Sequence, residues 1–331
     1  MSYPSLTVKN ILVTGGAGFI GSNLCEELLR QGNRVTCLDN FSTGKHDNIA
    51  SFLENPKFTL IEGDIRNYED CQRAVKGVDL VFHEAALGSV PRSINDPIIS
   101  TDVNIGGFVK MLFAAKEEGV KRFIYAASSS TYGDHPALPK VEENIGKPLS
   151  PYAITKYVNE LYAENFSKLY GIETIGLRYF NVFGKRQDPD GAYAAVIPKF
   201  AKMLIEHQQP VINGDGNHSR DFTHIENVVL MNLLAATTQN QKAVNQVFNT
   251  ACGERNTLNQ LVTYLKEFLS EFDPAIESIV PVFGKEREGD VLHSLASIEK
   301  AKNYLGYTPA CLFKEGLRRS ASWYFQLVVK Q

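Results

Sequence analysis

Tyr152 and Lys156 are the residues of this 331-residue chain whose types and spacing most directly suggest acid–base chemistry. They stand four positions apart in a stretch that is typical of a helix, with Pro151 in its first turn, so they share one helix face. A tyrosine with an ordinary pKa of ~10 is a poor base at neutral pH. A neighbouring ammonium group, or another positive charge close by, would favour the phenolate and lower that pKa. The pair is therefore a candidate for proton transfer, although the same spacing is common on exposed helices.

A serine cluster, Ser128-Ser129-Ser130, follows the apolar run from Arg122 to Ala127. A hydroxyl at the end of such a strand can hydrogen-bond a reacting oxygen and relay a proton. Without other evidence, a polar transition from strand to loop is the favoured interpretation of the cluster.

A glycine-rich turn must position these groups if the chain binds a dinucleotide. The segment Asn10–Gly21 has an apolar run and then Gly15, Gly18 and Gly21, before an amphipathic stretch. In the context of strand, turn and helix, the three glycines permit a tight turn, close approach of a pyrophosphate and close packing of the helix on the strand. An ordinary tight turn would explain three glycines alone.

Two acidic residues at strand ends strengthen the dinucleotide hypothesis. Asp39 ends the run from Arg34 to Leu38, roughly 20 residues after the glycines, where a ribose-binding acid is expected. Its carboxylate would accept from the ribose hydroxyls and repel a 2′-phosphate, so NAD is preferred over NADP. Asp64 follows a third apolar run and either reaches the adenine or caps a helix near Tyr68.

The pattern along the chain predicts an α/β fold. Strand and helix patterns alternate over about the first 180 residues, which indicates a doubly wound parallel sheet with helices on both faces, a Rossmann fold that binds NAD. Residues 8–182 are expected to form this domain, with some later segments returning to it. Residues 183–331, with helices near Ile197–Glu206, Leu258–Phe272 and Phe313–Val328, are expected to form mainly a smaller substrate-binding lobe.

Composition excludes several classes of function. The formal net charge is −3, which gives no pull toward nucleic acid or anionic membranes. No apolar run of the ~20 residues needed for a membrane span, and no signal peptide, is expected. The five cysteines are scattered, so neither a metal site nor a disulfide framework is predicted, and a cytoplasmic location is the default.

The order of these motifs resembles that of the extended short-chain dehydrogenase/reductase family. The matching segments are TGGAGFIG, LDN, GDI, HEAA, Asn104, the serine cluster, YAITK and RYFNVFG. Within the family the chain is most similar to UDP-sugar 4-epimerases, and among these to the UDP-N-acetylglucosamine 4-epimerases. The resemblance extends from Asn10 to about Tyr324.

The resemblance implies specific roles. Tyr152 would be the acid/base and Lys156 would orient the nicotinamide ribose, with Ser128, Ser129 or Ser130 assisting at the sugar 4-hydroxyl. Counting back from Tyr132-Gly133 favours Ser128, but the cluster is one residue shorter there than in many relatives. The remaining implied NAD-binding residues are Gly15, Gly18, Phe19, Ile20, Gly21, Asp39, Asn40, Asp64, Ile65, Ala85, Asn104 and Tyr179. The implied UDP-sugar-binding residues are Gly88, Ser89, Asn181, Ala195, Val196, Lys199, Arg220, Arg287, Asp290 and Ser294.

The implied activity is epimerisation at C4 through a transient 4-keto sugar, with NAD regenerated in each turnover. Ser294 stands where epimerases restricted to UDP-glucose and UDP-galactose carry a tyrosine, so an acetamido group is expected to fit. Relatives pair through the segments Val103–Glu118 and Tyr152–Tyr170, so a homodimer is expected.

The alternatives are an epimerase for UDP-glucose, UDP-galactose or a uronate, a 4,6-dehydratase, a decarboxylase, or a non-catalytic NAD sensor. The serines after the fifth strand argue against a dehydratase, which typically has an Asp-Glu pair there. Intact Tyr152 and Lys156 argue against a sensor.

Overall fold

A seven-stranded parallel sheet organises the chain in this computed structural model, which describes residues 3–6, 9–190, 194–285 and 293–329. The strand order is β11-β6-β5-β4-β1-β2-β3, and every paired strand runs parallel to its neighbour. The strands are β1 (Asn10–Thr14), β2 (Arg34–Asp39), β3 (Phe58–Glu62), β4 (Leu80–His83), β5 (Arg122–Ser128), β6 (Glu173–Tyr179) and β11 (Gln246–Thr250).

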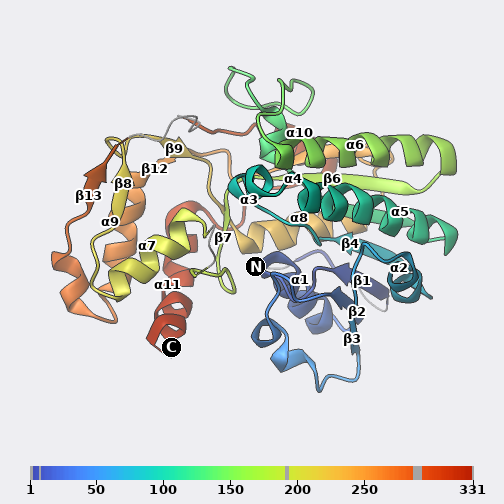
Figure 1. Cartoon of the computed structure of the whole chain (residues 1–331), viewed down its shortest axis with the longest axis horizontal. Coiled ribbons are helices and arrows are strands. Elements are labelled where there is room, and N and C mark those ends of the chain that lie inside the picture. The colour runs from blue at the N-terminus through green and yellow to red at the C-terminus, as the bar shows by residue number, and fades with distance from the viewer. Residues whose placement is uncertain (1–2, 7–8, 191–193, 286–292, 330–331) are drawn as a thin grey trace.

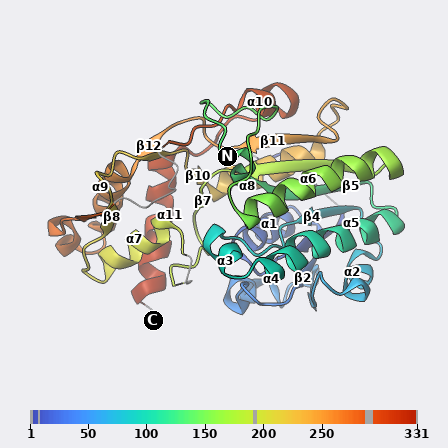
Figure 2. The same ribbon diagram turned by 45° about the horizontal axis from the view of Figure 1, so that its top comes forward.

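Helices cover both faces of this sheet, as the sequence predicts for a doubly wound fold (Figures 1 and 2). Alternate side chains of β1 point to opposite faces, as the pleat of a strand requires. Ile11 and Val13 pack with α1 (Phe19–Arg30) and α8 (Ile225–Thr237). Leu12 packs on the other face, which α2 (Tyr68–Val75), α5 (Phe108–Glu117) and α6 (Pro151–Tyr170) cover.

The strand order reverses between β1 and β4, and this reversal determines where a ligand can bind. From β1 the chain proceeds outward to β2 and β3, whereas β4, β5 and β6 extend the sheet in the other direction. The helices that follow β1 and β4 therefore diverge and leave a crevice outside the carboxyl ends of these strands.

A second lobe follows β6 and has its own hydrophobic core. Its principal helices are α7 (Val196–Ile205), α9 (Leu258–Leu269) and α11 (Phe313–Val329), which pack on one another through a separate cluster of buried apolar side chains. Figure 1 shows this lobe on the left, with the sheet and its helices on the right. The short paired strands here are β7 (Val182–Phe183) with β10 (Thr223–His224), β9 (Ser219–Arg220) with β12 (Asn256–Thr257), and β8 (Val211–Asn213) with β13 (Val282–Gly284).

Short helical segments complete the described part of the chain. They are η1 (His46–Asn48), η2 (Ala50–Phe52), α3 (Val90–Asn95), α4 (Pro97–Thr101), η3 (Asp102–Gly107), η4 (Ser129–Tyr132), η5 (Pro274–Ser278) and α10 (Glu299–Leu305). The segment η3 is a π-helix, so the helix expected over 103–118 consists of η3 followed by α5. Such π-helical turns are frequent at functional sites.

One helical stretch bears on the expectation that no segment of the chain spans a membrane. The helical stretch Pro97–Glu117 is long and apolar enough to cross a membrane by length and composition alone. Its residues Phe108, Met111 and Leu112 are nevertheless fully buried against the sheet. This is the position of a core helix.

Candidate functional site

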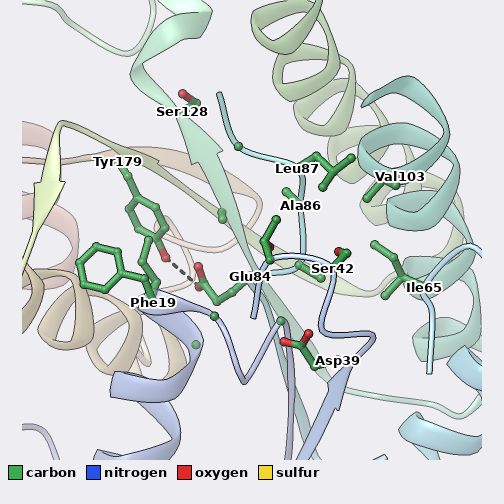
Figure 3. A pocket seen from close by; sticks show the side chains of 18 of the residues that line it. Phe19, Asp39, Ser42, Ile65, Glu84, Ala86, Leu87, Val103, Ser128 and Tyr179 are labelled. Carbon is green, nitrogen blue, oxygen red and sulfur yellow. Dashed lines mark hydrogen bonds between the residues drawn. The ribbon is translucent and has the colours of Figure 1, made fainter. Parts of the chain in front are cut away.

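A pocket of about 370 Å³ lies in the crevice outside the carboxyl ends of the central strands (Figure 3). It brings together most of the residues that the sequence assigned to cofactor binding and catalysis. Those that line it are Gly15, Gly18, Phe19, Ile20, Gly21, Asp39, Asn40, Asp64, Ile65, Ala85, Ser128, Tyr152, Lys156 and Tyr179, with Gly88 and Asn181 from the substrate set.

The glycine turn forms one wall of the pocket and fits a pyrophosphate. Gly15 has a φ of +67°, and an added Cβ would lie 2.8 Å from the backbone of Ala85. A Cβ on Gly21 would lie 2.2 Å from the Gly15 carbonyl oxygen, so the helix can approach the turn only because Gly21 lacks one. Helix α1 begins at Phe19 without a side-chain cap. Its first backbone N–H groups and the positive end of its dipole therefore face the pocket, where an anion is stabilised.

Asp39 and Asp64 lie at the carboxyl ends of β2 and β3. The Asp39 carboxylate accepts from the backbone N–H groups of Ala17 and Phe41, both at 2.9 Å, so it also fixes the glycine turn. Burial raises the pKa of Asp39, and these backbone donors oppose the shift. Hydrogen bonds from Arg66 lower the pKa of Asp64 to about 2. Asn67, rather than Asp64, is the N-cap of α2.

Tyr152, Lys156 and Ser128 form the opposite wall. The Lys156 ammonium donates to the Ala126 carbonyl oxygen at 2.7 Å, and this bond fixes α6 to the end of β5. Burial lowers the pKa of Lys156 to about 8, against the opposing charges of Glu84 and Glu160. Burial raises the pKa of Tyr152, and a hydrogen bond with Ser128 opposes this. The expected lowering by Lys156 is therefore not present in the protein alone, where burial is the larger influence.

The geometry distinguishes between the three serines. Ser128 is buried and lines the pocket, whereas Ser129 and Ser130 belong to η4 and do not. The Ser130 hydroxyl donates to the Ser128 oxygen at 2.9 Å, as does the Ser130 backbone N–H at 3.2 Å. Ser128 is therefore the member of the cluster that is placed to contact a substrate, and Ser130 orients it.

Asn104 acts at a distance from the pocket. Its side-chain amide accepts from the Leu87 N–H at 2.8 Å and donates to the Leu87 carbonyl and to the Thr155 hydroxyl. Thr155 in turn donates to the Tyr152 carbonyl at 2.8 Å. Asn104 thus fastens the segment after β4 to the helix that carries Tyr152, and it does not itself line the cavity.

Several residues expected to bind the substrate lie outside this pocket. Ser89 caps α3 by accepting from Arg92 N–H, and Arg220 and Ser294 lie at β9, where the Ser294 N–H donates to the Ser219 carbonyl at 3.0 Å. Ala195, Val196 and Lys199 lie at the start of α7 in the lobe. Arg287 and Asp290 lie outside the described residues.

Glu84 and Ser93 are site residues that the sequence reasoning missed. Glu84 lines the pocket and accepts from the Tyr179 hydroxyl at 2.8 Å (Figure 3). Ser93, in α3, accepts from the Tyr152 backbone N–H at 3.0 Å. The available signal for Glu84 was a charged side chain in a segment of small residues after a buried strand.

All five cysteines are buried and free. One group of possible metal ligands, His224, Glu226 and Cys311, has donor atoms within 4.8 Å of one another. The Glu226 carboxylate already forms an ion pair with Arg319 at 2.6 Å. This pairing argues against these three residues as a metal centre.

The chain is similar to a protein family model and to several solved structures. The family model described as "NAD dependent epimerase/dehydratase family" matches residues 11–251. The chain is 38% identical to the UDP-N-acetylglucosamine 4-epimerase of Methanobrevibacter ruminantium, solved with UDP-N-acetylmuramic acid, with a TM-score of 0.88 over 97% of this chain and 100% of that one.

Two other solved structures are similar over nearly their whole length. The UDP-glucose 4-epimerase of Thermotoga maritima, solved with UDP-glucose, is 36% identical with a TM-score of 0.88, covering 96% of this chain and 99% of that one. The UDP-glucuronic acid 4-epimerase of Bacillus cereus, solved with UDP-glucuronic acid and NAD, is 32% identical with a TM-score of 0.87 and the same coverage.

Proposed function

The chain belongs to the NAD dependent epimerase/dehydratase family, and we propose that it is a 4-epimerase that interconverts UDP-N-acetylglucosamine and UDP-N-acetylgalactosamine. NAD is the cofactor of this family, and the glycine turn, the uncapped start of α1 and Asp39 fit it. The observation that carries the proposal is the meeting of Tyr152, Lys156 and Ser128 on the wall opposite that turn.

Different residues of the pocket would bind different parts of the cofactor. The start of α1 would hold the pyrophosphate, and Asp39 the adenine ribose. Asp64, with Asn40 donating to it at 2.8 Å, would border the adenine. Lys156 would hold the nicotinamide ribose, since its ammonium has further donors beyond the one that bonds Ala126.

The chain's own groups account for the proton movements. Tyr152 would act as the phenolate, which Lys156 and the positively charged nicotinamide ring favour once the cofactor is bound. It removes the proton from the sugar 4-hydroxyl, and the Ser128 hydroxyl bonds that oxygen and relays the proton. Hydride removal at C4, and its return to the opposite face, is the chemistry that bound NAD supplies. Between the two transfers the 4-keto sugar turns over while its nucleotide stays bound. Tyr152 then returns the proton to the 4-oxygen, which becomes the new 4-hydroxyl.

The acetamido preference is supported by the resemblance: Ser294 is a small residue beside β9, at the position where relatives restricted to UDP-glucose and UDP-galactose carry a tyrosine. A uronate substrate is less favoured, because Lys156 is the only cation among the described residues that line the pocket, and its remaining donors are assigned to the nicotinamide ribose. UDP-glucose and UDP-glucuronate remain the rival substrates, since similar solved structures contain them.

We also propose that residues 8–182, together with β11 and α8, form the NAD-binding domain, and that most of 183–331 forms the UDP-sugar-binding lobe.

Exposed apolar side chains on α5 and α6 support a homodimer through that face. A cytoplasmic location completes the proposal.

Product analysis after incubation with single UDP-sugars tests the proposed function. With UDP-N-acetylglucosamine the product should be its 4-epimer, without the keto-deoxy sugar that a dehydratase would form. A parallel sample with UDP-glucuronate should release no carbon dioxide, which a decarboxylase would release. Tyr152→Phe should fold and keep NAD but lose activity by ~10²–10⁴-fold, the contribution of a general acid–base group. Near-normal turnover in this variant, or a wild-type protein that leaves every UDP-sugar unchanged, would contradict the proposal.

A further inference from the structure

Glu84 carries a carboxyl group whose surroundings the proposed mechanism does not explain. It stands directly after β4 and lines the pocket. Its Oε1 accepts from the Tyr179 hydroxyl at 2.8 Å, and Figure 3 shows the two side chains pointing toward one another. Oε2 is buried and receives no hydrogen bond from the residues that the structure describes. A buried oxygen without a donor is costly and calls for an explanation.

The hydrogen bond to Oε1 has a fixed direction. The Tyr179 oxygen accepts from the Asn232 side-chain amide at 2.9 Å, so the tyrosine proton is directed to Glu84. Asn232 lies in α8, Tyr179 at the end of β6 and Glu84 after β4, so three elements hold the carboxyl group in place. A donor of this kind favours the charged form of the carboxyl group.

Lys156 is the nearby cation. Burial raises the pKa of Glu84 to about 7, while the Tyr179 hydroxyl and the Lys156 charge oppose that shift. The effect is mutual, since the charge of Glu84 opposes the lowering of the Lys156 pKa. Glu84 follows β4, which pairs with β5, and Lys156 bonds the Ala126 carbonyl of β5, so both residues lie at the same end of the pocket, where the nicotinamide half of NAD would bind.

We propose that the Glu84 carboxylate, held by Tyr179 in the wall of the pocket beside the nicotinamide site, favours the oxidised cofactor over the reduced one. The oxidised nicotinamide ring is a cation and the reduced ring is neutral, so a negative charge on Glu84 stabilises the oxidised form, and the cationic ring in turn favours the ionised carboxyl group. An epimerase requires bound NAD to be oxidised whenever a new substrate arrives, and such a charge would protect the resting enzyme from remaining reduced. This inference rests on the proposed function, because it requires that the pocket binds NAD.

The test measures the ratio of bound NADH to bound NAD. Holoenzyme is equilibrated, without substrate, in an excess of NAD and NADH at a fixed ratio. The protein is then separated from free nucleotide and denatured, and the released NAD and NADH are quantified. Glu84→Gln removes the charge at nearly constant volume and should raise the bound ratio about tenfold, which corresponds to ~1.4 kcal/mol for the loss of one negative charge from a partly buried site. That change corresponds to about 30 mV for a two-electron couple.

Two controls separate charge from structure. Glu84→Asp retains the charge and should keep the ratio within about twofold of the parent. Asp64→Asn, on the far side of the pocket, should weaken both nucleotides equally and leave the ratio unchanged. If Glu84→Gln does not fold, Glu84→Leu tests the same charge with an apolar side chain suited to burial.

The outcomes also separate this inference from the proposed function. If either neutral variant binds nicotinamide nucleotide with the parental ratio, Glu84 does not act on the cofactor's charge. A parent protein that binds neither nucleotide would instead overturn the assignment of the pocket to NAD.

Discussion

The Ser93 hydroxyl accepts a hydrogen bond from the backbone N–H of Tyr152 at 3.0 Å, while it donates to the Val90 carbonyl at 2.8 Å. Tyr152 is the second residue of α6, and its N–H has no acceptor within the helix. Ser93 lies in α3, which follows the pocket-lining segment after β4. The segment that borders the cofactor site therefore also sets the position of the candidate acid/base.

Ser93→Ala should lower kcat by about 3–10-fold while leaving the NAD content unchanged, because one hydrogen bond of ~0.5–1.5 kcal/mol is lost where it orients Tyr152. The matched control is Ser150→Ala, which removes the cap of the same helix from the Ala153 N–H. That variant should lower stability by ~1 kcal/mol with a smaller effect on kcat. Equal effects of both variants on kcat would mean that Ser93 only stabilises the helix.

Denatured wild-type protein should release NAD(H) rather than NADP(H), because the Asp39 carboxylate would repel a 2′-phosphate. Asp39→Asn should weaken NAD retention by roughly 10–100-fold, since charged hydrogen bonds contribute ~1.5–3 kcal/mol. Chromatography of the nucleotide released per protomer measures both outcomes. Mostly NADP(H) in the wild type would refute the role of Asp39.

Ser294→Tyr should selectively abolish epimerisation of the acetylated sugars, because the ring would occupy the proposed acetamido space. NAD content should be unaffected. Ser294→Ala is the matched control and should retain the acetylated activity, since Ser294 donates its hydrogen bond to Ser219 from the backbone N–H, which alanine keeps. Parental activity of the tyrosine variant on the acetylated pair would refute the pocket argument while leaving the epimerase assignment intact.

The chain should form a homodimer through α5 and α6, as measured by light scattering at micromolar concentration. Ile154, Leu161 and Leu169 recur along one side of α6 and are each about half exposed or more, at 50%, 47% and 65%. Leu161→Arg should therefore shift the protein toward monomer, because a charge would be buried without a partner. Phe283→Arg, on an exposed side chain of β13 in the lobe, should remain dimeric. A monomeric wild type would exclude this interface.

Acidification should destabilise the protein in part through His83. Burial lowers the pKa of this imidazole to about 3, and the unfolded chain has a value of ~6.5. Its stabilising contribution is therefore complete above pH ~6.5 and is lost as the pH falls toward 3. Between pH 7.5 and 5 the loss is about 2 kcal/mol. In urea denaturation, the free energy of unfolding of His83→Phe should fall by about 2 kcal/mol less than that of the wild type over this pH range. The same pH dependence in both proteins would contradict the assignment to His83.

The sequence predicted the parts of the site that follow local rules. Gly15, Asp39 and Lys156 stand at strand ends or on one helix face, and such positions can be read from spacing. The positions of Glu84 and Ser93 depend on contacts with residues 95 and 59 positions away, and no local pattern encodes such contacts. The sequence also did not reveal α8, which is apolar on nearly all sides and therefore lacks the periodicity of a surface helix.

The place of β11 in the sheet has a consequence for synthesis of the chain. β11 pairs with β6 at the edge of the sheet, yet 66 residues separate the end of one from the start of the other, since β6 ends at Tyr179 and β11 begins at Gln246. While the ribosome makes that intervening stretch, a strand destined for complete burial has an open edge on one side. Open edges of this kind recruit other chains, and non-local pairing is slow to form. The nascent protein is therefore most exposed to misassembly, and to capture by chaperones, in the interval before Thr250 emerges.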